Sequence, residues 1–163
     1  MISDKVVKAM NEQINLEYVS AYIYLGMSLE MDIKGFKGYS SWLFIQYGEE
    51  TKHAEKFIDF IQRRGFKPTL TDIAVPKSAT KTPLEISKVA YAHEMKVSAS
   101  IDKIYELASK EGDYASASFL KWFIDEQVEE EENTRNIVDM FEAAGSDTTA
   151  MFQIDKFLSK REE

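Results

Sequence analysis

The stretch Glu49-Glu50-Thr51-Lys52-His53 places a carboxylate and an imidazole three positions apart, at Glu50 and His53. Positions i and i+3 share one face of a helix, so these two side chains can bind one metal ion. The same spacing also arises by chance on helix surfaces, where it gives only a solvated contact. The rest of the chain therefore decides between a solvated pair on a helix surface and a pair of metal ligands that faces the interior of the protein.

The composition limits the class of protein. The 163 residues, 44% of them hydrophobic, suffice for one well-buried core and predict a single domain over residues 1–163. A net charge of −8 speaks against nucleic acid and anionic membrane as partners and favours cations. The sequence has no cysteine, which excludes disulfides, thiolate zinc sites and iron–sulfur clusters. Because no signal core or run of ~18 apolar residues occurs, we expect a cytoplasmic protein.

The small number of glycines and prolines and their positions predict an all-α fold. Seven glycines and three prolines interrupt a sequence that has almost no strand-like alternation. We expect helices over about 4–32, 39–64, 83–110 and 114–144, and a short fifth helix from Ser146 or Asp147 to about 159. The clearest start is Thr82-Pro83-Leu84-Glu85, which combines an N-cap threonine, a first-turn proline and a capping-box glutamate. Residues 160–163 are expected to be a frayed tail.

The helix lengths favour a ferritin-like four-helix bundle architecture over a pile of shorter helices. Helices of about 28 residues are roughly 40 Å long at 1.5 Å per residue. The connection over 66–82, which contains Pro68 and Pro76, can span that length at about 3.3 Å per residue. We therefore expect a long crossover that makes helices two and three parallel, while the short turns form two antiparallel hairpins.

The inward positions of each helix, at alternating steps of three and four, contain a carboxylate. These are Glu17, Glu50, Glu94 and Glu130, with His53 one turn after Glu50. Glu17 and Glu50 are 33 residues apart, centred on the first turn, and Glu94 and Gln127 are 33 apart, centred near the second. Each hairpin thus brings its pair to the same height.

Four buried carboxylates need compensation, because each unpaired buried ion costs several kcal/mol. Two divalent cations balance the four charges. An oxygen-rich set with one imidazole nitrogen suits iron or manganese, and zinc can also occupy it. The alternative, carboxylates on solvated faces, requires all four helices to be rotated from the expected phase.

These residues carry a resemblance to the ferritin-like di-iron family, whose bundles build such sites from all four helices. More closely, the whole chain resembles bacterial non-haem ferritin. Thr51 stands where bacterioferritins have a haem-ligating methionine, so no haem is expected. Rubrerythrins have a cysteine-ligated iron domain that this chain lacks, and the small ferritins of starved cells lack the fifth helix.

The resemblance implies roles for the inner residues. Glu17, Glu50 and His53 would bind one iron, with Glu50 bridging to a second iron held by Glu94 and Glu130. Gln127 would lie beside the second iron and, being neutral, would hold it more weakly than a carboxylate.

The resemblance also implies a third iron site at Glu49, Glu126 and Glu129, sharing Glu130, and we favour it over the alternative of ordinary helix-surface charge. Tyr24 would lie near the metals, as a hydrogen-bond or electron donor or simply as a buried tyrosine with a satisfied hydroxyl.

Two further side chains near the inner positions are not expected to take part in metal binding. Trp122 is interpreted as a packing residue, with electron donation as the alternative. His93 is rotated about 100° from Glu94 and is therefore expected at the surface or at an interface.

By this resemblance the protein would be an iron storage ferritin. It would act as a ferroxidase, oxidising Fe(II) with dioxygen or hydrogen peroxide, and store ferric mineral in a homo-oligomer of 24 subunits. Two alternatives stay open. One is a non-storage di-iron or di-manganese peroxidase or oxygenase, and the other is a non-catalytic, metal-stabilised bundle.

Overall fold

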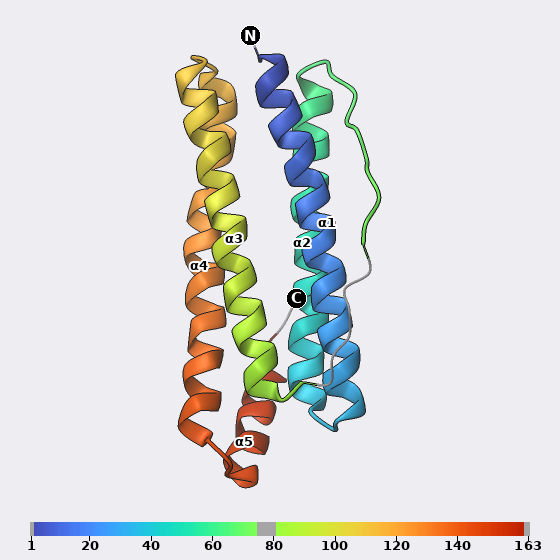
Figure 1. Cartoon of the computed structure of the whole chain (residues 1–163), viewed down its shortest axis with the longest axis vertical. Helices are drawn as coiled ribbons and strands as arrows, with labels where there is room; N and C mark the ends of the chain where they lie inside the picture. Colours follow the sequence, from blue (N-terminus) through green and yellow to red (C-terminus); the bar gives the residue numbers. More distant parts are fainter. Residues whose placement is uncertain (1, 75–80, 162–163) are drawn as a thin grey trace.

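The computed structural model describes residues 2–74 and 81–161. Its helices are α1 (Asp4–Ile33), α2 (Lys37–Arg63), α3 (Pro83–Lys110), α4 (Tyr114–Ala144) and α5 (Thr148–Leu158). α1 and α2 form one antiparallel hairpin, α3 and α4 form the other, and α5 packs at the end of the bundle (Figure 1). The predicted four-helix bundle with a short fifth helix is confirmed. Within the described chain, no helix has the length and hydropathy needed to cross a membrane.

Local chemistry fixes the helix ends. The predicted capping box of α3 is present: the Thr82 hydroxyl accepts from the Glu85 amide at 3.2 Å, and the Glu85 carboxylate accepts from the Thr82 amide at 2.7 Å. After α1 and α2 the chain turns at Gly35 and Gly65, whose φ angles are +86° and +85°. This left-handed region favours glycine, so the helices stop where expected.

The second helix begins earlier than predicted, at Lys37, so Gly38 lies in its first turn rather than in the preceding loop. A Cβ atom at Gly38 would lie 1.9 Å from the backbone oxygen of Asp155 in α5. Beside this contact the Tyr39 amide donates to the Asp155 carboxylate at 2.8 Å. Gly38 is therefore a point of close approach between α2 and α5.

The crossover runs along α1. The Thr69 amide donates to the side chain of Asn11 at 2.7 Å, and the Lys81 amide donates to the carboxylate of Glu30. Asn11 and Glu30 are 19 residues apart in α1, about 28 Å along the helix axis. The connection thus follows most of the bundle, and α2 and α3 are parallel as predicted (Figure 1). Pro76 lies outside the described residues.

The hydrophobic core consists of two clusters with a buried polar layer between them. One cluster contains Met10, Phe57, Ile101 and Leu120, and the other contains Met27, Leu43, Ala90 and Phe141. The polar layer is contributed by all four long helices. Its members are Gln13, Glu17, Ser20, Gln46, Glu50, His53, His93, Glu94, Gln127 and Glu130. Packing of the two apolar clusters holds this layer at mid-height.

Candidate metal centre

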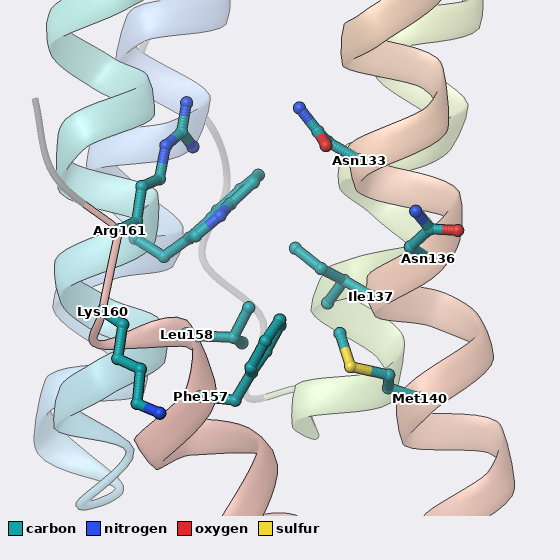
Figure 2. A pocket seen from close by; sticks show the side chains of 9 residues that line it. Asn133, Asn136, Ile137, Met140, Phe157, Leu158, Lys160 and Arg161 are labelled. Atoms are coloured by element: carbon teal, nitrogen blue, oxygen red, sulfur yellow. The ribbon is translucent and has the colours of Figure 1, made fainter.

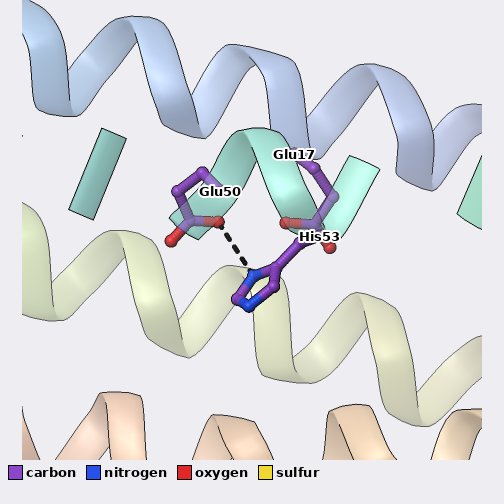
Figure 3. A group of neighbouring side chains, drawn as sticks. All are labelled: Glu17, Glu50 and His53. Carbon is purple, nitrogen blue, oxygen red and sulfur yellow. Dashed lines mark ion pairs between the residues drawn. The ribbon is translucent and has the colours of Figure 1, made fainter. Parts of the chain in front are cut away.

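Glu17, Glu50 and His53 form the centre of the polar layer. Each offers a ligand atom, and these atoms lie within 4.8 Å of one another (Figure 3). His53 Nδ1 is 3.4 Å from Glu50 Oε2, and all three side chains are buried. The Glu-x-x-His pair therefore faces the bundle interior, and the hairpin places Glu17 at its level as predicted.

The second hairpin contributes Glu94 and Glu130, which are also buried. The Tyr24 hydroxyl donates to Glu94 Oε1, and Gln127 Nε2 donates to Glu94 Oε2 at 3.2 Å. Tyr24 is therefore buried beside the cluster, with its hydroxyl paired to Glu94. Gln127 lies level with Glu94, as the hairpin register predicts.

Two buried glutamines support the carboxylates. Gln46 Nε2 donates to Glu50 Oε1 at 3.2 Å and to Glu130 Oε2 at 2.8 Å, which links α2 to α4. Gln13 Nε2 donates to Glu17 Oε1 at 2.7 Å. Each glutamine lies four residues before its glutamate, a spacing that the sequence contains and that could have identified both as part of the site.

The cluster carries more negative charge than its protein partners offset. Burial, followed by the charge of Glu50, holds the pKa of Glu17 well above its usual range. Burial and the same charge raise the pKa of Glu94 to about 8, and burial and the charge of Glu94 raise the pKa of Glu130 to about 8. Glu17 Oε2 has no hydrogen-bond partner among the described residues. A buried carboxylate oxygen without a donor suits a bound cation.

His53 is tuned by the same charges. Burial alone lowers its pKa, but the interaction with Glu50 and the charges of Glu130 and Glu126 outweigh burial and raise it. A neutral imidazole is the form that binds a metal, so a cation must displace the proton that these carboxylates favour.

The three outer carboxylates lie at the edge of this cluster. Glu126 Oε1 is 3.9 Å from His53 Nε2. Burial raises the pKa of Glu126, and the nearby charges of Glu129 and Glu49 raise it further. Glu129 is exposed, while Glu49 forms an ion pair with Arg161. Of the predicted third-site residues, Glu126 thus lies beside His53, and Glu49 already has a cationic partner.

Arg161 was not expected at the site, and the prediction that the tail is frayed is wrong for this residue. Its Nη1 donates to Gln46 Oε1 at 2.8 Å, and its Nη2 donates to Glu49 Oε2. The guanidinium also lies 4.5 Å from the centroid of the Trp42 ring. A contact over more than 100 residues leaves no local signal in the sequence.

The prediction that His93 lies at the surface or at an interface is also wrong, because the residue is buried within the chain. Its ring is 8% exposed, and its Nε2 lies 2.6 Å from the hydroxyl of Ser20 in α1. The small Ser20 side chain leaves room for an imidazole between α1 and α3. Trp122 packs edge to face against His53, with ring centroids 5.6 Å apart, and is 40% exposed.

Comparisons with known proteins identify the family of the chain. The ferritin-like domain family matches residues 7–144. A bacterial non-heme ferritin of Bacteroides fragilis is 38% identical over 161 residues, covering 99% of this chain and 100% of the relative. A bacterial non-heme ferritin of Staphylococcus haemolyticus is 35% identical over 161 residues, covering 99% and 97%.

A solved structure, the open pore ferritin of the archaeon Archaeoglobus fulgidus, matches with a TM-score of 0.98 and 41% identity. The match covers 99% of this chain and 100% of that one. The resemblance to bacterial non-haem ferritins is confirmed, and the chain belongs to the ferritin-like domain family.

Proposed function

We propose that this protein is an iron-storing ferritin that oxidises Fe(II) at its inner carboxylate cluster. The observation that carries the proposal is the convergence of Glu17, Glu50, His53, Glu94 and Glu130 in one buried layer. Two divalent ions compensate the four carboxylates, and Glu17 Oε2 is a ligand atom without another partner among the described residues.

We assign Glu17, Glu50 and His53 to one Fe(II) ion and Glu94 and Glu130 to the other. Glu50 would bridge the two ions, because its carboxylate lies between His53 and the Gln46 amide that also contacts Glu130. Gln127 brings a neutral amide to the Glu94 side. This side therefore holds its ion more weakly.

Fe(II) is the substrate of the reaction. Two Fe(II) ions lose one electron each, and one dioxygen takes both electrons and two protons to give hydrogen peroxide. When hydrogen peroxide is the oxidant, it takes the two electrons and two protons and gives two waters. The protein fixes geometry and charge. Glu94 and Glu130, with pKa values of about 8, carry protons near neutral pH, and Fe(II) binding releases them. Tyr24 holds the Glu94 carboxylate in place.

We further propose that the ferric product collects as mineral inside a shell of 24 chains, and that Glu49, Glu126 and Glu129 bind a third iron. The family membership and the names of the relatives support storage. The position of Glu126 beside His53, and the effect of the Glu129 and Glu49 charges on the pKa of Glu126, support the outer site.

One experiment tests storage directly. Particle size is measured first, and Fe(II) is then added without oxygen, followed by oxygen. We expect a large hollow particle that takes up many irons per chain. A small oligomer that stops at two irons per chain and consumes peroxide rapidly would instead favour a non-storage peroxidase or oxygenase.

A second experiment tests the outer site. We expect the triple variant Glu49→Ala, Glu126→Ala, Glu129→Ala to bind fewer Fe(II) ions per chain and to show altered oxidation kinetics. If stoichiometry and kinetics stay unchanged, the assignment of a third iron to these residues is wrong.

A further inference from the structure

The Arg161 side chain occupies a built cation site. Its guanidinium is held by the Gln46 amide oxygen at 2.8 Å, by the Glu49 carboxylate, and by the face of Trp42 at 4.5 Å. Gln46 is fully buried and Trp42 is 6% exposed. An anion, an amide oxygen and an aromatic face are three groups that each attract a cation.

The position of this guanidinium conflicts with a metal ion on the outer carboxylates. A carboxylate that accepts charge-assisted hydrogen bonds from Arg161 has fewer free lone pairs for coordination. The positive charge of the Arg161 guanidinium, held beside Glu49, also repels a divalent ion that approaches Glu126. Arg161 and a metal ion therefore exclude each other at Glu49.

The structure also offers the side chain another position. Arg161 lines a cavity of about 480 Å³ between the C-terminal segment and α4. Figure 2 shows Arg161 on one side of this cavity and Asn133 and Asn136 of α4 on the other. Their amide oxygens can accept hydrogen bonds from a guanidinium that leaves Glu49.

We propose that Arg161 is a tethered cation that competes with a third metal ion for Glu49. The Arg161 side chain occupies Glu49 when no metal is bound there. Metal binding at Glu49 displaces this side chain toward the cavity. The inference rests on the proposed function, since the competing ion would be iron. Because the coupling is reciprocal, whatever loosens Arg161 strengthens binding of the third ion.

The test uses the full-length assembled protein and Zn²⁺, a divalent ion without redox chemistry, in calorimetric titrations. We expect Arg161→Ala to raise the affinity for the third ion by roughly tenfold, within the usual range of coupling between sites, and to change the affinity for the two inner ions less than this. Arg161→Lys, which keeps the charge but loses the planar fork, should give a smaller rise.

Lys160→Ala is the matched control, because Lys160 is exposed and points away from Arg161 in Figure 2. It removes the same charge from the same segment, and we expect little change. In a Glu49→Gln background, Arg161→Ala should have a smaller effect, because the ion pair between the two residues is already lost.

Trp42 provides an independent readout. The chain has two tryptophans, so Trp122→Phe leaves Trp42 as the only source of tryptophan fluorescence. We expect its emission to change as the third Zn²⁺ binds, when the guanidinium leaves the ring, and this change to be missing in the Arg161→Ala variant.

The outcomes separate the inference from the proposed function. If the two inner ions do not bind in the unmodified protein, the proposed function fails. If they bind but Arg161→Ala leaves the third affinity unchanged, or raises it no more than Lys160→Ala does, competition by Arg161 is overturned. A Trp42 signal that persists without Arg161 overturns it too.

Discussion

Glu50 influences three other carboxylates of the inner cluster. Its charge contributes to raising the pKa of Glu17, Glu94 and Glu130. Glu50→Gln removes one negative charge from this set, so we expect the metal-free protein to become more stable by about 1 kcal/mol. We expect Fe(II) oxidation to fall to the rate in protein-free solution, because the bridge between the two ions is lost. Urea unfolding and stopped-flow absorbance measure the two effects.

Glu55→Gln is the control for this prediction, since Glu55 is an exposed carboxylate of the same helix. It should change neither property. A Glu50→Gln protein that oxidises Fe(II) as fast as the unmodified protein would contradict the role of Glu50 as a bridge between the two ions.

Tyr24 and Tyr39 are a natural pair for testing a buried hydroxyl. Both are fully buried, but the Tyr24 hydroxyl donates to Glu94 whereas the Tyr39 hydroxyl has no partner among the described residues. Tyr24→Phe should cost about 1–3 kcal/mol of unfolding free energy and slow Fe(II) oxidation, because the Glu94 carboxylate loses one of its two donors. Tyr39→Phe should be neutral or stabilising. Equal effects of the two substitutions would argue against a role for the hydrogen bond.

The inner residues could be predicted from sequence because helical periodicity sets which side of each helix faces the core. His93 and Arg161 could not. The space for His93 depends on the small Ser20 side chain of another helix, and Arg161 reaches Gln46 and Glu49 through a long side chain from a distant segment. Periodicity describes one helix at a time and does not include such contacts.

At the scale of elements, the junction of α2 and α5 depends on Gly38. In Gly38→Ala, the new Cβ atom would clash with the Asp155 backbone oxygen, which cannot move aside as a flexible side chain can. We expect a loss of about 1–3 kcal/mol in unfolding free energy and a weakened hydrogen bond from Tyr39 to Asp155. Urea unfolding measures the loss, and hydrogen exchange of the α5 amides shows whether this helix detaches.

Gly48→Ala is the matched control in the same helix. No heavy atom outside its own helix lies within 4 Å of a Cβ atom built at Gly48. Alanine there should stabilise α2 by about 0.5–1 kcal/mol. If Gly38→Ala behaves like Gly48→Ala, the close approach of α5 has no energetic consequence.

Helix boundaries were predicted well where a local cap decides them, as at Thr82. The prediction was less accurate at Gly38, where the contact with α5, a helix distant in the sequence, explains the glycine. The glycine was placed in a turn because glycine usually marks one, but here its small size serves a contact between helices.

For the molecule as a whole, the buried carboxylates predict an unusual dependence of stability on pH. Glu94 and Glu130 have folded-state pKa values of about 8, above the ~4.3 of an unfolded glutamate. Between these values the folded protein binds more protons than the unfolded chain. The stability of the metal-free protein should therefore fall as pH rises from 5 to 8, by up to about 1.4 kcal/mol per pH unit for each group.

Urea unfolding of the metal-free protein across this pH range measures the slope. Glu94→Gln and Glu130→Gln should each reduce it, because each removes one of the groups that titrate. Bound metal should reverse the trend, since coordination requires deprotonated ligands. A metal-free protein whose stability rises from pH 5 to 8 would contradict the assignment of these two groups as the dominant buried acids.

The contacts of Arg161 also affect how the protein should be prepared for study. Arg161 pairs with Glu49, so a peptide fused a few residues beyond Arg161 starts near this carboxylate, because a chain extends at most about 3.6 Å per residue. A C-terminal polyhistidine tag would bring imidazoles to the carboxylates whose metal content is to be measured. Asp4 precedes Glu17 by 13 residues of α1, about 20 Å, so an N-terminal tag is the safer choice.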